Sequence, residues 1–252
     1  MGFDTTYFGP SAWQLLHLIS FDPAVESSDK IKLLSFLKYI LPCKYCRRSV
    51  MKFEKIHGLP KPDSEAQWLF DLHNHVNDRL RKQSKKDSTI KVIEVNPTFE
   101  EIEIKYNRLL SKPPTQVPGR DFLFTVASNY PDKNIQNKEE IEKDFIKTLG
   151  AVYPFMKHRK IFQNYLMHHP IDLKLYSKWM YGLLFKLSAR TCAREIPSYR
   201  GFMSRIMYYK SGCSKKTYRG VTCRNMKGGF TKTRNRRRTF RVTRASLLQL
   251  KQ

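Results

Sequence analysis

Two segments decide the fold of this chain: residues 41–46 (Leu-Pro-Cys-Lys-Tyr-Cys) and residues 68–82 (Trp-Leu-Phe-Asp-Leu-His-Asn-His-Val-Asn-Asp-Arg-Leu-Arg-Lys). A Cys-x-x-Cys pair directly after a proline predicts two thiols in the first turn of a helix. The free N–H groups and the helix dipole at that end favour a thiolate, and the short spacing favours a reversible disulfide. Cys43 and Cys46 are therefore a candidate redox pair.

Residues 68–82 predict an amphipathic helix. His73, Asn77 and Arg81 follow one another at steps of four residues, with Asn74 beside them. This edge of the helix is polar, basic and rich in amides, which favours a large anionic ligand over plain solvent. The apolar residues of the same helix recur at steps of three and four residues: Trp68, Leu69, Leu72, Val76 and Leu80.

The composition indicates a folded protein with a strongly basic end. The 252 residues are 40% hydrophobic and 13% aromatic, which suffices for one large domain or two small ones. The net charge is +25, and residues 200–252 contain sixteen lysines and arginines and no acidic residue. No apolar run is long enough for a transmembrane helix. The first residues lack the pattern of a signal peptide, so we do not expect secretion by that route.

Helical patterns recur along most of the chain, and the predicted fold class is all-α. Residues 84–97 are a charged linker with the one strand-like run. Short loops between the first four helices favour a bundle. We expect three parts: an N-terminal domain at 1–97, a helical domain at 98–209 and a basic flexible tail at 210–252. The predicted helices are 11–20, 29–41, 43–56, 64–83, 98–111, 119–129, 138–151, 155–168 and 172–190.

The second helical domain has features of a degenerate copy of the first. The interval from Pro42 to Trp68 is 26 residues, and that from Pro154 to Trp179 is 25. Such a copy keeps the packing and loses the chemistry. Two unrelated helical segments with Tyr-Pro turns would also explain the pattern, and this alternative stays open. In the repeat register Cys43, Cys46, His73 and Asn77 become Phe155, His158, Leu184 and Ser188.

Three motifs in a fixed order carry a resemblance to a known family. They are Gly9-x-x-x-Trp13-x-x-Leu16-His17, then Pro42-Cys43-x-x-Cys46, then Gln67-Trp68-Leu69 with His73-Asn74-x-Val76-Asn77-x-x-Leu80-x-Lys82. Together they resemble the Erv/ALR family of FAD-linked sulfhydryl oxidases, over residues 7–83 and about a third of the chain. The helical extension without family motifs is most similar to the mimivirus type of these enzymes, from large DNA viruses.

The resemblance implies a helical bundle that holds FAD with a disulfide against the isoalloxazine ring. Cys46 would lie nearest the flavin as a charge-transfer thiolate, and Cys43 would be the sulfur that the incoming thiol attacks. Protein dithiols would be oxidised, and electrons would pass through FAD to O2 to give H2O2. The implied cofactor-binding residues are Gly9, Trp13, His17, Cys46, His73, Asn74, Asn77 and Lys82.

The same resemblance implies a partner and a location. Enzymes of this family pair through their first helices, so we expect a homodimer. An oxidase of the mimivirus type would act in the host cytoplasm, in the virus factory or in the virion. Protein dithiols and O2 are the expected substrates.

Two departures from the family pattern concern cysteines. No cysteine lies between residues 47 and 191, so the structural disulfide that usually follows the position of Lys82 is absent. A fifth helix must then be held by packing alone. No shuttle pair lies near the N-terminus, and Cys213 and Cys223 in the basic tail are the candidates for that role. They would accept electrons from the substrate and pass them to Cys43 and Cys46.

The residues alone leave a second function open. The cysteine pair could be structural, and the basic tail could bind nucleic acid or an anionic surface. A zinc site needs four ligands, and the sequence has no second close cysteine pair, so no metal site is expected. The histidines without partners at ligand spacing are predicted to lie on the surface: His57, His158, His168 and His169.

Overall fold

The computed structural model describes residues 2–85, 90, 92–130, 135–189 and 196–212, and these residues are almost entirely helical. The all-α prediction is confirmed. No helix in the described ranges has the length and apolar content to cross a membrane. The helices are α1 (Thr5–Phe21), α2 (Ser27–Ser35), α3 (Leu37–Ile40), α4 (Lys44–His57), α5 (Glu65–Ser84), α6 (Phe99–Leu110), α7 (Arg120–Asn129), α8 (Lys138–Val152), α9 (Met156–His168), α10 (Tyr176–Ser188) and α11 (Tyr199–Tyr209).

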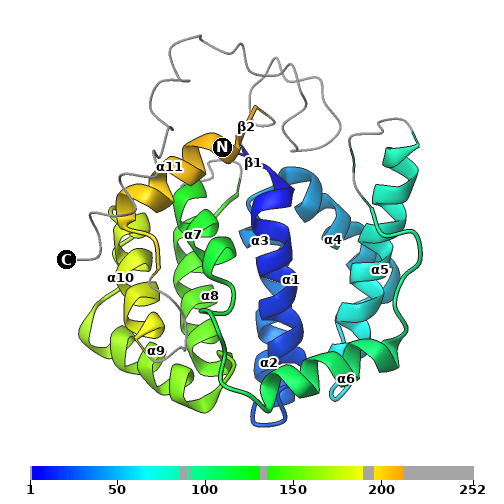
Figure 1. Cartoon of the computed structure of the whole chain (residues 1–252), viewed down its shortest axis with the longest axis horizontal. Helices are drawn as coiled ribbons and strands as arrows, with labels where there is room; N and C mark the ends of the chain where they lie inside the picture. The colour runs from blue at the N-terminus through cyan, green and yellow to red at the C-terminus, as the bar shows by residue number, and fades with distance from the viewer. Residues whose placement is uncertain (1, 86–89, 91, 131–134, 190–195, 213–252) are drawn as a thin grey trace, which may run out of the picture.

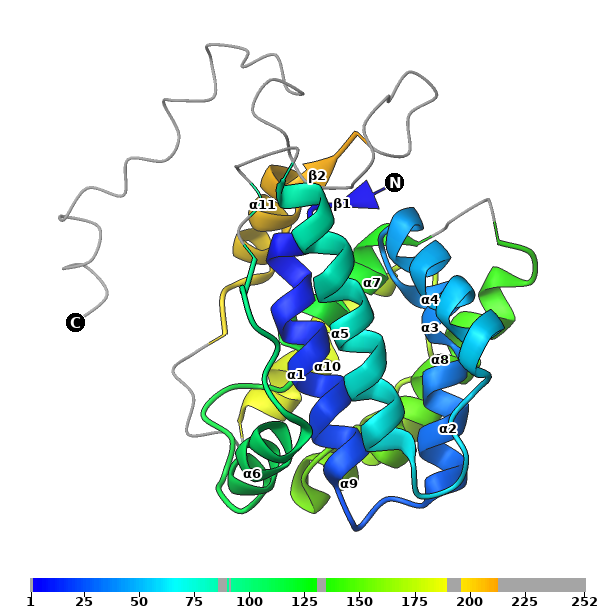
Figure 2. The same cartoon turned by 90° about the vertical axis from the view of Figure 1, so that its right-hand side faces the viewer.

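Helix α1 lies at the centre of the molecule. Figure 1 shows α4 and α5 on one side of α1, α7 and α8 on the other, and α6 across one end. Helix α1 contacts α5, α6 and α7, and α2 contacts α8; Figure 2 shows α1 and α5 side by side. Buried side chains of both halves form one continuous cluster. The proposed division into domains stays a prediction, and its two helical parts share this core.

Helix α1 begins six residues earlier than predicted. Asp4 is its N-cap, and the Asp4 carboxylate accepts a hydrogen bond of 2.9 Å from the Thr6 N–H. This satisfies one of the N–H groups that a helix start leaves free. Gly9 and Pro10, which directly precede the predicted helix, lie inside the observed one.

The strand-like run in residues 84–97 was a wrong prediction for its described part, which contains no strand. Ile93 and Val95 are 48% and 82% exposed, and no described strand lies beside them to complete a ladder. The strands that do form are short. β1 (Gly2–Phe3) pairs antiparallel with β2 (Lys210–Ser211), so the first two residues assigned to the tail belong to the fold. The rest of the tail from residue 213, with Cys213 and Cys223, lies outside the described residues, as does Cys192.

Three other helix predictions differ from the structure. The helix expected at 29–41 divides into α2 and α3 at Phe36, whose N–H bonds to the carbonyl three residues earlier, at Leu33. Such an i−3 contact tightens the turn and interrupts the α-helical pattern. The helix expected from residue 172 begins at Tyr176. Helix α11 was not predicted, and its buried Phe202 packs against Phe124 of α7 with ring centroids 4.5 Å apart.

Helix α6 is held by aromatic packing, as expected for a fifth helix without a disulfide. Phe99 and Tyr106 of α6 both pack against Phe21, at ring-centroid distances of 5.8 and 5.9 Å. Ile102 and Tyr106 are buried together with Leu18 of α1. Helix α6 is therefore fixed on the same end of α1 that carries His17.

Two tryptophans support the repeat. The Trp68 indole N–H donates to the Gly58 carbonyl at 3.0 Å, and the Trp179 indole N–H donates to the His169 carbonyl at 3.1 Å. Each acceptor lies ten residues before its tryptophan and is the C-cap of the preceding helix, α4 or α9. This shared hydrogen bond supports the repeat, which stays a prediction.

Candidate functional site

The cysteine pair lies at the beginning of α4, as the sequence predicts. Cys43 is the N-cap residue, and its sulfur accepts a hydrogen bond of 3.2 Å from the Cys46 N–H. Both residues are free thiols in this structure. Cys43 is buried, with 1% of its surface exposed, and Cys46 is partly exposed.

The two thiols have shifted pKa values of opposite sign. Burial acts to raise the pKa of Cys43, but hydrogen bonds from the Cys46 side chain and from the N–H groups of Cys46 and Tyr45, with the nearby charge of Arg79, lower it overall. The hydrogen bond to Cys43, burial and the charge of Cys43 raise the pKa of Cys46. The two thiols therefore titrate as a coupled pair.

Aromatic and histidine side chains from α1 and α5 form a second cluster. The rings of Trp13 and His73 stack, with centroids 3.9 Å apart and an interplanar angle of 8°. His17 Nε2 lies 3.1 Å from His73 Nδ1, within hydrogen-bond distance. Tyr106 of α6 also stacks on His17, at a ring-centroid distance of 4.9 Å. The three sequence-predicted residues Trp13, His17 and His73 therefore lie in direct contact.

Burial keeps both histidines of this cluster neutral. Burial, then the charges of His73 and Lys105, lowers the pKa of His17 to about 3. Burial and the Lys105 charge lower the pKa of His73 to about 4. His17 Nδ1 is buried and has no hydrogen-bond partner among the described residues. A buried polar atom of this kind carries a free-energy cost that a hydrogen-bonding ligand would remove.

The remaining predicted residues of α5 form a polar edge. The Asn77 amide donates to Asn96 Oδ1 at 3.3 Å, and Asn74 is partly buried. Lys82 is exposed, about 13 Å along the helix axis from His73. At Gly9 of α1 an added Cβ would meet no atom within 4 Å, so packing gives no reason for a glycine there.

Helix α5 connects the histidine cluster with the cysteine pair. Arg79 lies about 9 Å along the axis of α5 from His73. Its guanidinium Nη1 donates to the carbonyl of Tyr45, between the two cysteines, at 3.2 Å. The helix that carries His73 and Asn77 therefore reaches the Cys-x-x-Cys turn.

Sequence reasoning missed several residues of this region. Tyr106 and Lys105 come from α6, outside the motifs, and tertiary packing alone places them beside His17. Arg79 lies two residues after Asn77, so its place inside the segment 68–82 could have marked it as a candidate site residue. Arg47 directly follows the cysteine pair, and its Nη1 donates to the Leu41 carbonyl at 2.7 Å.

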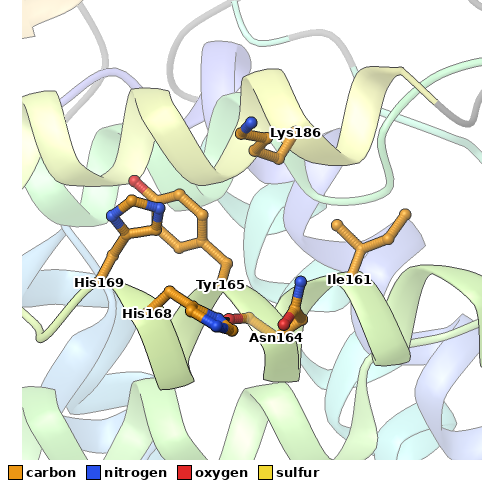
Figure 3. Close-up of a pocket in the computed structure, with 6 residues that line it drawn as sticks. All are labelled: Ile161, Asn164, Tyr165, His168, His169 and Lys186. Carbon is orange, nitrogen blue, oxygen red and sulfur yellow. Dashed lines mark hydrogen bonds between the residues drawn. The ribbon is translucent and has the colours of Figure 1, made fainter.

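A separate cavity of about 220 Å³ lies between α9 and α10. Figure 3 shows Lys186 on one helix and the other five labelled residues on the facing side of the pocket. No cysteine lines this cavity, and the described ranges contain no group of three His, Cys, Asp or Glu residues able to hold a metal ion. Its lining residues are Ile161, Asn164, Tyr165, His168, His169 and Lys186.

The histidines predicted at the surface divide into two groups. His57, His168 and His169 are exposed, as predicted. The prediction for His158 was wrong, because His158 is buried with 2% of its surface exposed. It lies on the inner side of α9, near Tyr153 and Phe155.

Comparisons with known proteins place the first part of the chain in a family. Residues 10–96 match the sequence model of the Erv1 / Alr family. The chain is 29% identical over 87 residues to the mitochondrial FAD-linked sulfhydryl oxidase ERV1 of Saccharomyces cerevisiae, a match that covers 31% of this chain and 46% of the yeast protein. It is 34% identical over 84 residues to the FAD-linked sulfhydryl oxidase of an African swine fever virus isolate from Kenya, which covers 31% of this chain and 71% of the viral protein. No solved structure gives a significant match.

Proposed function

Because the chain belongs to the Erv1 / Alr family, we propose that it is an FAD-linked sulfhydryl oxidase whose redox centre is Cys43 and Cys46. The observation that carries this proposal is the position of α5. This one helix stacks His73 on Trp13 and also contacts the cysteine turn through Arg79. A single bound molecule along α5 can therefore reach both clusters.

The residues present fit FAD. The flat faces of Trp13 and His73 suit the adenine ring, and the buried Nδ1 of His17 offers an unused hydrogen-bonding atom. Asn74 and Asn77 would hydrogen-bond the cofactor, and Lys82 would lie near its ribose or phosphates. When bound there, FAD would supply the redox chemistry: it would accept the electron pair of the reduced cysteines and pass it to O2, which would give H2O2.

The protein's own chemistry is thiol–disulfide exchange. A substrate thiolate attacks the Cys43 sulfur of the Cys43–Cys46 disulfide, and Cys46 leaves as a thiolate. The second thiolate of the substrate then displaces Cys43 from the mixed disulfide. One disulfide forms in the substrate and one is lost in the enzyme, and the two electrons now reside in the reduced pair. The hydrogen bonds that lower the pKa of Cys43 also favour it as a leaving group.

Four further proposals come from the sequence. Protein dithiols are the substrates, and the enzyme acts in the host cytoplasm, the virus factory or the virion. Cys213 and Cys223 act as a shuttle pair, so replacing both with serine should slow the oxidation of protein substrates but not of dithiothreitol. The chain forms a homodimer. Because α7 and α8 already pack on α1 and α2, any dimer must use other surfaces of those helices.

A nucleic-acid-binding function is the second candidate, supported by the net charge of +25 and by the basic residues after Arg200. The two functions differ in colour and in salt dependence. A flavoprotein oxidase is yellow and consumes O2 with a dithiol. A binding protein with a structural cysteine pair is colourless and retains nucleic acid at low salt.

The proposal is tested on the purified full chain. We expect a flavin absorbance spectrum that bleaches when dithiothreitol is added without air, and O2 consumption when air is present. Cys43→Ser should retain FAD and lose turnover, because the serine hydroxyl cannot form the disulfide. Cys192→Ser is the matched control and should keep turnover. A colourless protein, or a Cys43→Ser variant that oxidises dithiothreitol at the normal rate, would overturn the proposal.

A further inference from the structure

One charged side chain beside the cysteine pair has so far been described only as a contact between α5 and the cysteine turn. Arg79 extends from α5 to the Tyr45 carbonyl at 3.2 Å, and Tyr45 is the residue directly before Cys46. The side chain is partly buried. Its Nε atom is buried and, within the described ranges, has no hydrogen-bond partner. The guanidinium is thus held at the cysteine turn by one bond, with a further donor unused.

The cysteine turn has an arginine on each side. Arg47 donates from α4 to the Leu41 carbonyl before the pair, and Arg79 donates from α5 to the Tyr45 carbonyl within it. Lys38 of the neighbouring α3 is paired with Glu54, further along α4. The charged groups that act on the two sulfurs are therefore Arg47, Arg79 and the sulfurs themselves.

The second half of the chain shows what a structural arginine looks like in this fold. Arg159 bonds the Tyr153 carbonyl at 2.9 Å, as Arg47 bonds Leu41, but its other nitrogens contact the Asp22 carboxylate and the Ala24 carbonyl, each at 2.8 Å. Its charge is neutralised by Asp22. Arg79 forms no such ion pair with any described residue, so its charge acts on the sulfurs.

We propose that Arg79 is a positioning residue of the oxidase: its guanidinium holds the Cys-x-x-Cys turn against α5 and favours the thiolate form of the pair. This inference rests on the proposed function. Thiol–disulfide exchange proceeds through thiolates, so a fixed positive charge at the pair raises the reactive fraction. An arginine suits this role because it stays charged at every relevant pH. The lowering effect of Arg79 on both cysteine pKa values agrees with it.

The test is the pH dependence of alkylation in the reduced full chain. Peptide-resolved mass spectrometry after iodoacetamide treatment reports Cys43 and Cys46 separately from the other cysteines. In Arg79→Gln we expect the midpoint of the alkylation profile to rise by about one pH unit. Arg79→Lys keeps the charge, so its midpoint should stay close to that of the wild type. Arg108→Gln is the matched control, since Arg108 is an exposed arginine of α6.

Several outcomes decide the inference. An Arg79→Gln midpoint equal to that of the wild type overturns it, and so does an equal shift in Arg79→Lys, which would indicate a purely structural contact. Circular dichroism would show whether Arg79→Gln unfolds. In that case Arg79→Lys is compared with the wild type, and we expect its alkylation midpoint to shift by less than about half a pH unit. A larger shift would contradict the role of the charge. A protein without FAD would remove the oxidase proposal but leave this measurement valid, because alkylation needs no cofactor.

Discussion

The first half of the chain holds the candidate cysteine pair and the histidine cluster, and the second half shows similar aromatic packing without them. Phe53 packs edge-on against Trp68 at 5.3 Å, and Tyr165 packs edge-on against Trp179 at 5.4 Å. The rings of Phe53 and His57 are 4.4 Å apart, and those of Tyr165 and His169 are 4.3 Å apart. In both halves the helix after the proline and the helix with the tryptophan meet through matched side chains.

One difference between the halves lies at the position of the candidate redox pair. Cys43 has an extended backbone at the N-cap of α4, with φ −124°. Its counterpart Phe155 has φ 66°, a conformation that costs a bulky residue free energy, on the order of 1 kcal/mol or more. The Phe155 ring packs against the Leu18, Ile102 and Tyr106 cluster. The counterpart of the cysteine turn has thus become a packing contact between the halves.

The largest expected difference between the halves is in turnover. Cys46→Ser should reduce the oxidation of dithiothreitol by at least ~10³-fold, because no disulfide can form at α4. His158→Gln, at the equivalent position in α9, should leave turnover per folded molecule within about twofold of the wild type. Oxygen consumption measures both.

Placing a Cys-x-x-Cys pair in the second half tests the same comparison in the opposite direction. The double variant Phe155→Cys with His158→Cys should not create a second redox centre, because the Phe155 backbone differs from that of Cys43, and Leu184 and Ser188 replace His73 and Asn77. When this double variant is combined with Cys46→Ser, the protein should show no more turnover than Cys46→Ser alone. Recovered turnover there would show that the second half retains more of the site than its side chains indicate.

The next largest effect concerns the Arg159–Asp22 ion pair, one of the contacts between the halves. Arg159→Met should lower the free energy of unfolding by about 3 kcal/mol, because it leaves the buried Asp22 carboxylate unpaired. Asp22→Asn added to Arg159→Met should recover part of the loss. Urea unfolding measures both variants. An Arg159→Met variant as stable as the wild type would show that this ion pair does not hold the halves together.

A pH effect should be larger in the first half. His17 and His73 stay neutral in the folded chain down to about pH 3 and 4 and become protonated near pH 6.5 in the unfolded chain. Between these values the unfolded state binds more protons, so their contribution to stability is complete above pH 6.5 and is lost as the pH falls. At pH 5 the loss is roughly 2 kcal/mol for each histidine.

The measurement is urea unfolding at pH 7.5 and pH 5. The double variant His17→Gln with His73→Gln should show a smaller difference between the two pH values than the wild type. His158→Gln should change the difference less, because the backbone of Leu187 opposes the effect of burial on the His158 pKa. A double variant with the wild-type pH dependence would contradict the neutral, buried state of the two histidines.

The smallest expected effect tests the repeat itself. Trp68→Phe and Trp179→Phe each remove one indole hydrogen bond to a C-cap carbonyl, and each should lower the unfolding free energy by about 1 kcal/mol. Equal losses would support the equivalence of the halves. A loss in only one of them would show that the matched hydrogen bonds do not have matched energies.

Most of the helices and the local position of the cysteines were predictable because they depend on nearby residues. The spacing of Leu69, Leu72 and Val76 defines one face of α5, and Pro42 with Cys43 marks the beginning of α4. The strand-like run near Ile93 was misjudged because a strand needs a partner, which a local pattern does not reveal. His158 was misjudged because burial depends on what packs against α9.

The sequence by itself determined the candidate chemistry, since the identity and spacing of Cys43, Cys46 and His73 predict a redox pair and a ligand-binding helix edge. Only the tertiary structure decided which side chains act together. It brought Tyr106 of α6 onto His17, Arg79 of α5 onto the cysteine turn, and α7 onto α1. The reason is physical: backbone hydrogen bonds fix a helix within a few residues, whereas packing joins residues that are far apart in the chain.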